Sequence, residues 1–356
     1  MSTSSGSALV FTLGLLDQNY AKTAHGLIRG SDRFNLEAVI DPVHAGKDAG
    51  MVLDGHQRNI PVYKSVDEAL NEHPTIRYAI VGIAPVGGKL PPELLEQLLY
   101  CAGKGLSIVS GLHEYVSDKP EIVAAALRIG TQIIDIRKPK PKSELHFWTG
   151  KIFEVQCPIV AVLGMDCAIG KRSTTRFLLE GCKKAGIKAE MIFTGQTGWM
   201  QSGRYGFVLD STYNDFVSGE LEHAIVSCWE NEKPDIIFLE GQSALRNPSG
   251  PCGSELLVSG NAKQTILLYA PKRKYFDGNP AWGKIPSLQS EIDLIKAYGS
   301  EVIGVALNTT DCSLEEAIQF QKSIREEVQL PVSLPIEEGV NELITALKQK
   351  IKNAAR

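Results

Sequence analysis

Short apolar runs alternate with helical patterns along almost the whole chain, and this alternation restricts the fold more than any other feature of the sequence. In the first part, strands are expected around ALVFTLG, LEAVID, RYAIVGIAP, LSIVSGL and TQIIDIR, with helices such as AKTAHGLIRG, VDEALNE, PPELLEQLLYCAGKG and PEIVAAALRIG between them. Strands that are separated by helices form a parallel sheet, because parallel neighbours need a crossover connection. The pattern therefore predicts an α/β fold with doubly wound sheets.

A polar stretch rich in lysine and proline, RKPKPKSELHFWTGK, interrupts the alternation near the middle of the chain. Pro139 and Pro141 disfavour helix there, which is typical of a connection between domains. The alternation then restarts with IVAVLG, STTRFLLEGCKKAG, KAEMIFTG, DIIFLEG, QTILLYA and EVIGVALNT, and ends in VNELITALKQKIKNAA. At about 150 residues per domain, 356 residues suit two domains. We expect a boundary near residues 138 to 155, with domains over 1–147 and 148–356.

The composition of the chain argues against nucleic acid and membranes as binding partners. The formal net charge is −4, with 43% apolar and 22% charged residues, so the chain lacks the positive charge that attracts nucleic acid or an anionic membrane. A small-molecule partner is expected instead. The N-terminus has no basic signal region and no apolar run reaches the roughly 18 residues of a membrane helix, which predicts a cytoplasmic protein. Seven cysteines without a C-x-x-C pair indicate neither a zinc site nor a disulfide framework.

The first domain is Rossmann-like in the order of its elements but lacks a dinucleotide fingerprint. Its opening strand is followed by LLDQNYAKTAHG, which contains no G-x-G-x-x-G to hold a pyrophosphate. Asp41 ends the second strand where a ribose-binding acid would lie, although an acid at a strand end is more often a turn residue or a helix cap. Gly87 and Gly88, in APVGGKLPPE, either present N–H groups to an anion or form an ordinary glycine turn.

The second domain opens with a strand, PIVAVLG, followed by a glycine loop, a lysine and a helical pattern. This order separates a phosphate-binding loop from a chance match. Gly164 and Gly170 let backbone amides point inward, the start of the helix adds positive potential, and Lys171 adds a point charge, so the site favours a polyphosphate. Cys167 lies inside the loop, either as a small filling residue or as a thiolate nucleophile.

The loop differs in two ways from a Walker A motif, G-x-x-x-x-G-K-[ST]. Five residues separate its glycines, and Arg172 stands between Lys171 and the hydroxyls of Ser173 and Thr174. The spacing resembles that of dethiobiotin synthetase and related P-loop enzymes, in which a hydroxyl directly after the lysine binds the Mg²⁺ of ATP. Either Ser173 or Thr174 holds the metal by a shift of register, or Arg172 neutralises phosphate without a metal. The second option suits phosphates that are held rather than cleaved, and we expect no metal.

Three downstream segments extend the resemblance to dethiobiotin synthetase. The strand DIIFLEG ends in Glu240, where those enzymes carry an acid near the metal and substrate, unless Glu240 caps a helix. In GVALNTT, Asn308 matches the position whose amide reads adenine, unless it is only a turn residue. FTGQTG forms a polar loop after a strand, where doubly wound sheets bind ligands. The pocket suits adenosine with a pyrophosphate, which ATP and coenzyme A share. The side chains expected to bind substrate are Thr194, Gln196, Thr197 and Gln242.

The chain more closely resembles a two-domain family that long had no assigned function, in segments spread over nearly its whole length. The matching segments are AKTAHGLIR, SGLHEYVSDKPE, IIDIRKP, GMDCAIGKRSTT, TGQTGWMQSGRYGFVLD, NDFVSGELE and EGQSAL. A member of that family is a D-glutamate N-acetyltransferase, which uses acetyl-CoA. The resemblance implies a Rossmann-like N-terminal domain, a P-loop NTPase-like C-terminal domain and an acidic amino acid as substrate, although a shared family does not guarantee a shared substrate.

The chemistry of amine acetylation gives roles to residues in these motifs. The ammonium group must lose a proton, the acidic substrate must be held, and the oxyanion at the thioester carbon must be stabilised. Glu240 and Asp166 are the candidate bases because both lie at the mouth of the P-loop sheet by chain position, unless Asp166 only orders its loop. Arg204, in SGRYG, is the candidate clamp for a substrate carboxylate, and the backbone amides of TGQTG are candidates for the oxyanion.

Three functions follow from these alternatives. The first is an N-acetyltransferase that moves acetyl from acetyl-CoA to an acidic amino acid such as D-glutamate. The second is an ATP-dependent ligase or kinase resembling dethiobiotin synthetase, against which Arg172 counts. The third is a non-catalytic nucleotide sensor, against which the polar residues of TGQTG count. We also expect a homo-oligomer, which is common for α/β enzymes of this size. The residues expected to hold the coenzyme are Gly164, Cys167, Gly170, Lys171, Arg172, Ser173, Thr174 and Asn308.

Overall fold

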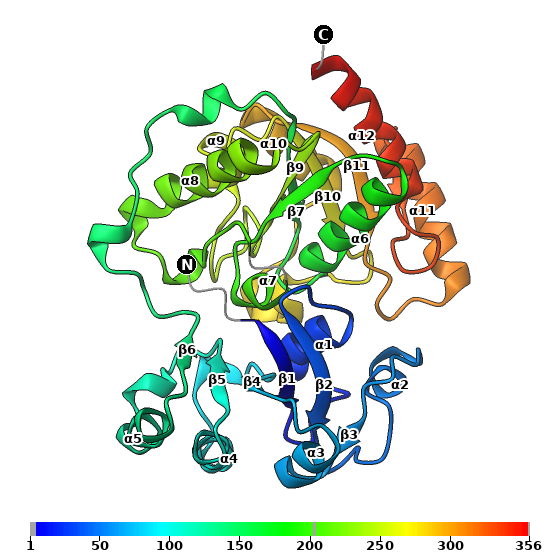
Figure 1. Ribbon diagram of the computed structural model, residues 1–356. Coiled ribbons are helices and arrows are strands. Elements are labelled where there is room, and N and C mark those ends of the chain that lie inside the picture. The colour runs from blue at the N-terminus through cyan, green and yellow to red at the C-terminus, as the bar shows by residue number, and fades with distance from the viewer. Residues whose placement is uncertain (1–4, 202–203, 355–356) are drawn as a thin grey trace. The chain divides into compact units, whose positions relative to one another are not determined.

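The structure, a computed structural model, describes residues 5–201 and 204–354 and separates into two compact units (Figure 1). The N-terminal unit comprises Met1–Pro139 and Gly195–Arg204, and the C-terminal unit comprises Lys140–Thr194 and Tyr205–Arg356. Each unit is built on its own parallel sheet with helices on both faces. These sheets confirm the predicted α/β fold.

In the N-terminal unit, six strands of the described chain pair in the order β3-β2-β1-β4-β5-β6, and all neighbours are parallel. This is the Rossmann order, in which the direction of winding reverses between β1 and β4. The strands are nearly continuous apolar runs because helices bury both faces of the sheet. Their bounds are Gly6–Phe11 (β1), Phe34–Ile40 (β2), Val62–Tyr63 (β3), Tyr78–Val81 (β4), Ser107–Ser110 (β5) and Ile133–Asp135 (β6).

Helices pack on each face of this sheet through buried aliphatic side chains. Leu94 and Leu98 of α4 and Ile122 of α5 contribute to the core on one face, together with residues of α3. Leu27 of α1 and Met200 of α7 contribute to the core on the other face, together with Ala49 of α2. The bounds are Lys22–Ile28 (α1), Ala49–Asp54 (α2), Val66–Glu72 (α3), Pro92–Gly103 (α4), Pro120–Ile129 (α5) and Gln196–Gln201 (α7).

Asp41, directly after β2, is fully buried and holds the loop that follows β1. Its carboxylate accepts hydrogen bonds from the Thr12 hydroxyl (2.7 Å) and the Leu16 N–H (3.1 Å), and lies 3.0 Å from Nδ1 of His44. Burial alone would raise the pKa of Asp41, but the hydrogen bonds from Thr12 and His44 bring it below its ordinary value. Asp41 is therefore a turn-holding residue, and its buried carboxylate is not placed to bind a ribose.

The C-terminal unit has the strand order β12-β11-β10-β7-β9-β8, again with parallel neighbours. The fully buried strand β7 lies between β10 and β9, so the loops after these three strands leave the sheet side by side. The two-residue strand β12 is too short to give a sequence signal. The bounds are Ile159–Gly164 (β7), Ala189–Ile192 (β8), Ile236–Glu240 (β9), Gln264–Tyr269 (β10), Glu301–Leu307 (β11) and Val332–Ser333 (β12).

The helices of this unit also cover both faces of its sheet. Figure 1 shows α6 and α12 on one side and α8, α9 and α10 on the other. Leu178 of α6 and Leu343 of α12 share one core cluster, and Leu221 of α8 and Ile295 of α10 belong to the other, which also includes Ala317 of α11. The bounds are Lys171–Lys184 (α6), Asn214–Glu232 (α8), Ser254–Val258 (α9), Leu288–Ala297 (α10), Leu314–Val328 (α11) and Asn341–Ala354 (α12).

The segment expected as a polar loop over residues 193–198 is in fact helical from Gln196, where α7 begins. The prediction was wrong because Thr and Gly favour helix poorly, whereas the stabilising contacts come from distant residues of the N-terminal unit. The Gln201 amide donates to the carbonyls of Gly26 (2.6 Å) and Gly30 (3.0 Å). The Ser31 hydroxyl and the Asp32 N–H in turn donate to the last carbonyls of α7.

The connection after residue 139 is fastened to α8 by two buried acids. Glu220 accepts from the Lys140 ammonium (2.6 Å) and the His146 N–H (3.0 Å), and Glu222 accepts from the Thr149 N–H (2.6 Å) and hydroxyl (2.8 Å). Directly before Glu220, Gly219 lets the connection pass so closely that a Cβ there would lie 2.0 Å from the His146 carbonyl oxygen. These contacts explain the GELE sequence within α8 as an anchor for the connection.

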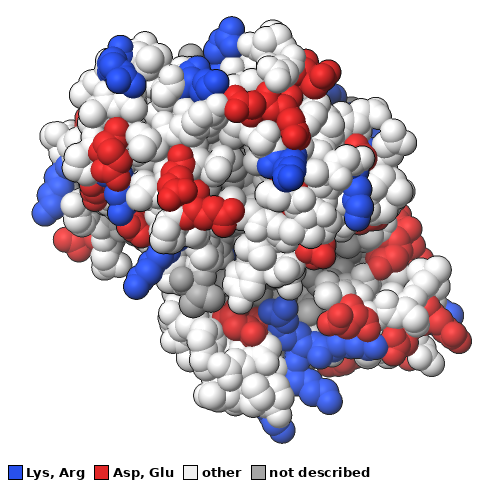
Figure 2. Space-filling view, turned by 90° about the horizontal axis from the view of Figure 1, so that it is seen from below, with Lys and Arg blue, Asp and Glu red and all other residues white. Residues whose placement is uncertain are grey.

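The distribution of surface charge and the hydropathy of the helices bear on which partners the chain can bind. On the face shown in Figure 2, basic and acidic side chains occur in small groups of either sign. Among residues 5–201 and 204–354, no helix is both long and apolar enough to cross a membrane.

Candidate functional site

The glycine loop connects β7 to α6 at the carboxyl end of the sheet in the C-terminal unit. Ala168 and Gly170 have left-handed φ angles of 53° and 95°, which turn the chain back on itself before the helix starts. Among the described residues, the backbone N–H groups of Cys167, Ala168 and Gly170 meet no hydrogen-bond acceptor. Free amides in a tight loop at the start of a 14-residue helix fit the oxygens of a phosphate group.

Lys171 lies buried beneath this loop, with 6% of its surface exposed. Its stem passes close to Gly164 and Gly241, where a Cβ would lie 3.2 and 3.1 Å from Lys171 Cδ. Its ammonium donates to the Asp166 carbonyl at 2.6 Å. Burial lowers the pKa of Lys171, and the neighbouring acidic groups, Cys167 first among them, oppose this effect. An anionic ligand on the loop would restore the charge balance of this buried cation.

Asp166 is also buried, but its carboxylate is occupied by the protein. It accepts hydrogen bonds from the Asn247 amide (2.9 Å), the Arg273 guanidinium (3.0 Å) and the Asp277 N–H (2.9 Å). Both of its oxygens are engaged in these contacts. This geometry favours the alternative in which Asp166 orders the loop.

Glu240, at the end of β9, is the second buried acid at this edge of the sheet, with 2% of its surface exposed. One carboxylate oxygen, Oε2, accepts the Thr194 N–H at 3.1 Å. Burial raises the pKa of Glu240, whereas the charge of Arg172, the Thr194 N–H and the charge of Lys171 partly offset that effect. A carboxyl group with a raised pKa is a better proton acceptor than an ordinary glutamate.

Thr194 and Gln242 surround Glu240 with a short chain of hydrogen bonds. The Thr194 hydroxyl donates to the Glu240 carbonyl at 2.7 Å, and the Gln242 amide donates to that hydroxyl at 3.0 Å. These residues follow β8 and β9, which are neighbours in the sheet. The structure therefore brings Thr194, Gln242 and Glu240 together, beside the charges of Lys171 and Arg172.

The remaining coenzyme candidates lie around the first turn of α6. Ser173 is half-buried and Thr174 is buried. The Asn308 amide nitrogen donates to the Ile169 carbonyl (2.9 Å), and its oxygen accepts the Thr310 N–H (2.9 Å). Asn308 thus supports both the glycine loop and its own turn, and its role in reading adenine stays a prediction.

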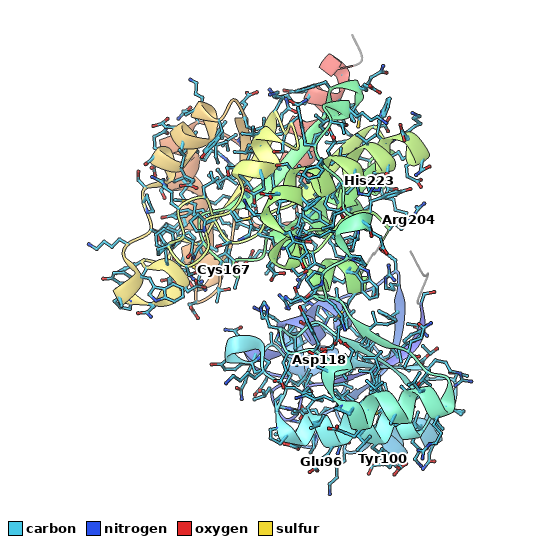
Figure 3. The ribbon with its side chains drawn as sticks, turned by 90° about the vertical axis from the view of Figure 1, so that its left-hand side faces the viewer. Glu96, Tyr100, Asp118, Cys167, Arg204 and His223 are labelled. Carbon is cyan, nitrogen blue, oxygen red and sulfur yellow. The ribbon has the colours of Figure 1, made fainter. Side chains whose placement is uncertain are left out.

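Three of the predicted substrate-binding residues belong to the N-terminal unit, in the segment that contains α7. Gln196 accepts a hydrogen bond from the Arg137 guanidinium at 3.0 Å, and the hydroxyls of Thr197 and Thr23 lie 3.5 Å apart. Arg204 is exposed (Figure 3). Their role in binding substrate stays a prediction.

Sequence reasoning missed three residues beside the loop: Asn247, Arg273 and Cys252. The Arg273 guanidinium bonds the loop at Asp166 and at the Cys167 carbonyl. Cys252 is buried and donates to the Glu255 carboxylate at 2.8 Å, and burial raises the pKa of its thiol. The basic run KRK after the strand QTILLYA was a usable signal for Arg273. Asn247 and Cys252 lie in an irregular segment that gives no comparable signal.

Both halves of the chain match models of one protein family. Residues 146–344 match a domain of unknown function described as the DUF1611 P-loop domain, and residues 42–139 match the Rossmann-like N-terminal domain of the same family. The chain is thus a two-domain α/β protein with a P-loop domain. It belongs to the DUF1611 family.

Similar proteins agree with this assignment. A crystal structure of a DUF1611 family protein from Anabaena variabilis superposes with a TM-score of 0.88, at 28% identity, over 96% of this chain and 99% of that one. Two relatives, from Tritonibacter scottomollicae and a Pseudoalteromonas species, carry the name D-glutamate N-acetyltransferase. Each is 28% identical to this chain, and the match covers 75% of this chain and 80% of the relative.

Proposed function

We propose that the protein transfers the acetyl group of acetyl-CoA to the amino group of an acidic amino acid such as D-glutamate. The observation that carries the proposal is the buried carboxyl of Glu240, with its raised pKa, next to a loop built for phosphate. The name of the two 28% identical relatives supports the same chemistry. Acetyl-CoA would supply an activated thioester, so the protein itself must hold the two substrates and move a proton.

We assign to Glu240 the role of the base that accepts the proton of the substrate amine. The substrate amine is an ammonium ion near neutral pH and becomes a nucleophile only after it loses a proton. The Glu240 carboxylate would accept that proton and the N–C bond would form. The C–S bond would then break as the nitrogen loses a second proton, which the departing coenzyme thiolate takes up. Thr194 donates to Glu240 and therefore fixes the orientation of this carboxyl group.

We assign to the phosphate loop the role of binding the diphosphate of the coenzyme. Its free N–H groups and Lys171 would bind phosphate oxygens, and Arg172 would add a permanent positive charge where related P-loop enzymes place a metal-binding hydroxyl. Because no phosphate bond is cleaved in acetyl transfer, the reaction does not need Mg²⁺. The buried Thr174 hydroxyl is the feature that an ATP-dependent enzyme would use instead.

The proposal is tested by calorimetric binding of acetyl-CoA and of Mg-ATP to one purified sample, together with mass-spectrometric detection of N-acetyl-D-glutamate. We expect acetyl-CoA to bind and the acetylated product to form in the presence of EDTA. Lys171→Ala should weaken acetyl-CoA binding by about 2 kcal/mol, the scale of a lost charged hydrogen bond. Lys184→Ala, which removes an exposed lysine from the other end of α6, is the matched control and should bind normally.

Other outcomes point to other functions. Binding and turnover of Mg-ATP that EDTA abolishes, without acetyl transfer, would favour the ligase or kinase. Tight nucleotide binding without any turnover would favour a sensor. Unchanged acetyl-CoA affinity in Lys171→Ala would contradict the assignment of the loop to the coenzyme.

A further inference from the structure

The segment that follows β10 concentrates positive charge next to the phosphate loop. Residues 270–285 carry Lys272, Arg273, Lys274 and Lys284 against one acid, Asp277, although the whole chain has a net charge of −4. Strand β10 pairs with β7, the strand that leads into the loop, so the segment leaves the sheet beside the loop. In Figure 3 this yellow part of the chain lies near the labelled Cys167.

Arg273 is the basic residue of this segment whose side chain bonds the loop. Its Nη1 atom donates to Oδ2 of Asp166 at 3.0 Å and to the Cys167 carbonyl at 3.2 Å. The Asp277 N–H donates to the same Asp166 oxygen at 2.9 Å and holds the segment from its other side. Arg273 therefore has a defined position at the rim of the loop, with 30% of its side chain exposed.

Most of the donors of Arg273 are still available for a ligand. A guanidinium group has five N–H donors, and the two contacts of Arg273 involve only Nη1. Within the described part of the chain, its Nε and Nη2 atoms have no acceptor. Nε and one Nη atom form the planar fork that binds two oxygens of a phosphate at once. The neighbouring Lys272 is different, because both oxygens of Glu316 accept from its ammonium at 2.7 Å.

Coenzyme A and ATP share the adenosine and the diphosphate but differ at the ribose. Coenzyme A carries a phosphate on the 3′-oxygen, whereas ATP has a hydroxyl group there. The loop N–H groups, Lys171 and Arg172 already provide for the diphosphate, so a further phosphate-binding fork at the rim would serve a second phosphate. We propose, resting on the proposed function, that Arg273 binds the 3′-phosphate of coenzyme A and thereby selects coenzyme A over ATP at this loop.

The experiment compares the affinities of coenzyme A and 3′-dephospho-coenzyme A by calorimetry. The intact protein should bind coenzyme A about tenfold or more tightly than the dephospho form, the scale of a charged hydrogen bond. In Arg273→Ala this preference should fall to about twofold or less, mainly through weaker binding of coenzyme A. Lys263→Ala is the matched control: it removes an exposed cation at the opposite end of β10 and should keep the full preference.

The comparison of the two ligands distinguishes an Arg273 that binds the 3′-phosphate from an Arg273 that only supports the loop. If Arg273 only positions Asp166 and the loop, Arg273→Ala will weaken both ligands by the same factor and the preference will persist, which overturns the proposal. Equal affinities of the intact protein for the two ligands also overturn it, while the acetyl-CoA function stands. If the intact protein binds neither ligand but binds Mg-ATP, the proposed function itself fails, and the role of Arg273 fails with it.

Discussion

Glu240 and Asp166 are buried acids at the same sheet edge, but their surroundings give them different roles. Asp166 has both oxygens engaged by Asn247, Arg273 and the backbone, which suits a residue that fixes the shape of the loop. Glu240 receives the Thr194 N–H on one oxygen, and its pKa is raised by burial. Two acids that look equivalent in the sequence are thus separated by their hydrogen-bond partners.

At the residue scale, we predict a pH dependence of turnover that belongs to Glu240. Because burial raises its pKa, the carboxylate that we propose as the proton acceptor forms only above the ordinary glutamate pKa of about 4.3, and kcat should rise with pH through the raised value. Glu240→Gln should lower kcat by about 100-fold or more and remove this acidic limb, while acetyl-CoA affinity changes little.

The control for this prediction is Glu291→Gln. Glu291 is also buried and has a raised pKa, but it pairs with Arg246 rather than with groups of the loop. Its replacement should leave the pH profile of kcat unchanged. A Glu240→Gln variant that loses acetyl-CoA binding but keeps kcat would assign Glu240 to positioning the coenzyme.

At the element scale, helix α8 holds the chain that connects the two sheets in sequence. The buried carboxylates of Glu220 and Glu222 both accept hydrogen bonds from residues 140–152, and Gly219 provides the space for that segment. His146 also stacks on His223 of the same helix, with ring centroids 3.7 Å apart. In Figure 3, His223 lies on the opposite side of the C-terminal unit from Cys167, so this anchor is remote from the phosphate loop.

We predict that Gly219→Ala destabilises the protein because the added Cβ would lie 2.0 Å from the His146 carbonyl oxygen. Overpacking of this kind costs about 1–3 kcal/mol and should lower the thermal midpoint measured by circular dichroism. Gly103→Ala makes the same chemical change in α4, where the described residues place no atom beyond the helix's own backbone and the chain neighbours within 4 Å of the new Cβ, and it should be neutral or slightly stabilising. If the two variants have equal thermal midpoints, the prediction is wrong, because the connection can then move away from α8 without loss of stability.

At the scale of the whole molecule, the stability depends on pH through buried acids, some with lowered and some with raised pKa values. Burial would raise the pKa values of Asp41, Glu220 and Glu222, but their hydrogen bonds outweigh it and the pKa values are lowered. Their contribution to stability is complete above the ordinary pKa of an unfolded carboxyl group, about 4, and is lost as the pH falls through the lower folded value. Glu240 and Glu291 have raised pKa values, so their contribution to stability is instead lost as the pH rises from the ordinary pKa to the raised folded value.

We therefore predict that the stabilisation provided by Glu222 depends on pH. In urea unfolding at pH 7, Glu222→Gln should lower the free energy of unfolding by about 2 kcal/mol, because it removes charged hydrogen bonds from Thr149 and Ile152. The difference from the original protein should shrink as the pH falls below the ordinary glutamate pKa and on through the lower folded pKa of Glu222, because the carboxylate is then progressively protonated. Glu180→Gln, at an exposed position of α6, should show almost no difference at either pH. A Glu222→Gln effect that is constant from pH 7 to pH 3 would contradict this assignment.

The sequence by itself determined the architecture and the position of the phosphate loop. Apolar runs such as IVAVLG and DIIFLEG, separated by helical patterns, predict buried parallel strands because periodicity and chain connectivity are local properties. The loop is equally local, since its glycines, Lys171 and the following helix are contiguous in the chain. Even Asp41 could be interpreted in this way, as the turn residue that it is.

Only the tertiary structure decided which polar groups meet at the site. Asp166 is held by Asn247 and Arg273, which lie 81 and 107 residues away, and no local pattern encodes such pairings. The helix that starts at Gln196 was predicted as a loop because its stabilising contacts come from residues 26–33 of the N-terminal unit. Burial and hydrogen bonding between distant segments arise only when the sheets assemble. They fix the protonation and availability of a side chain, and therefore its chemistry.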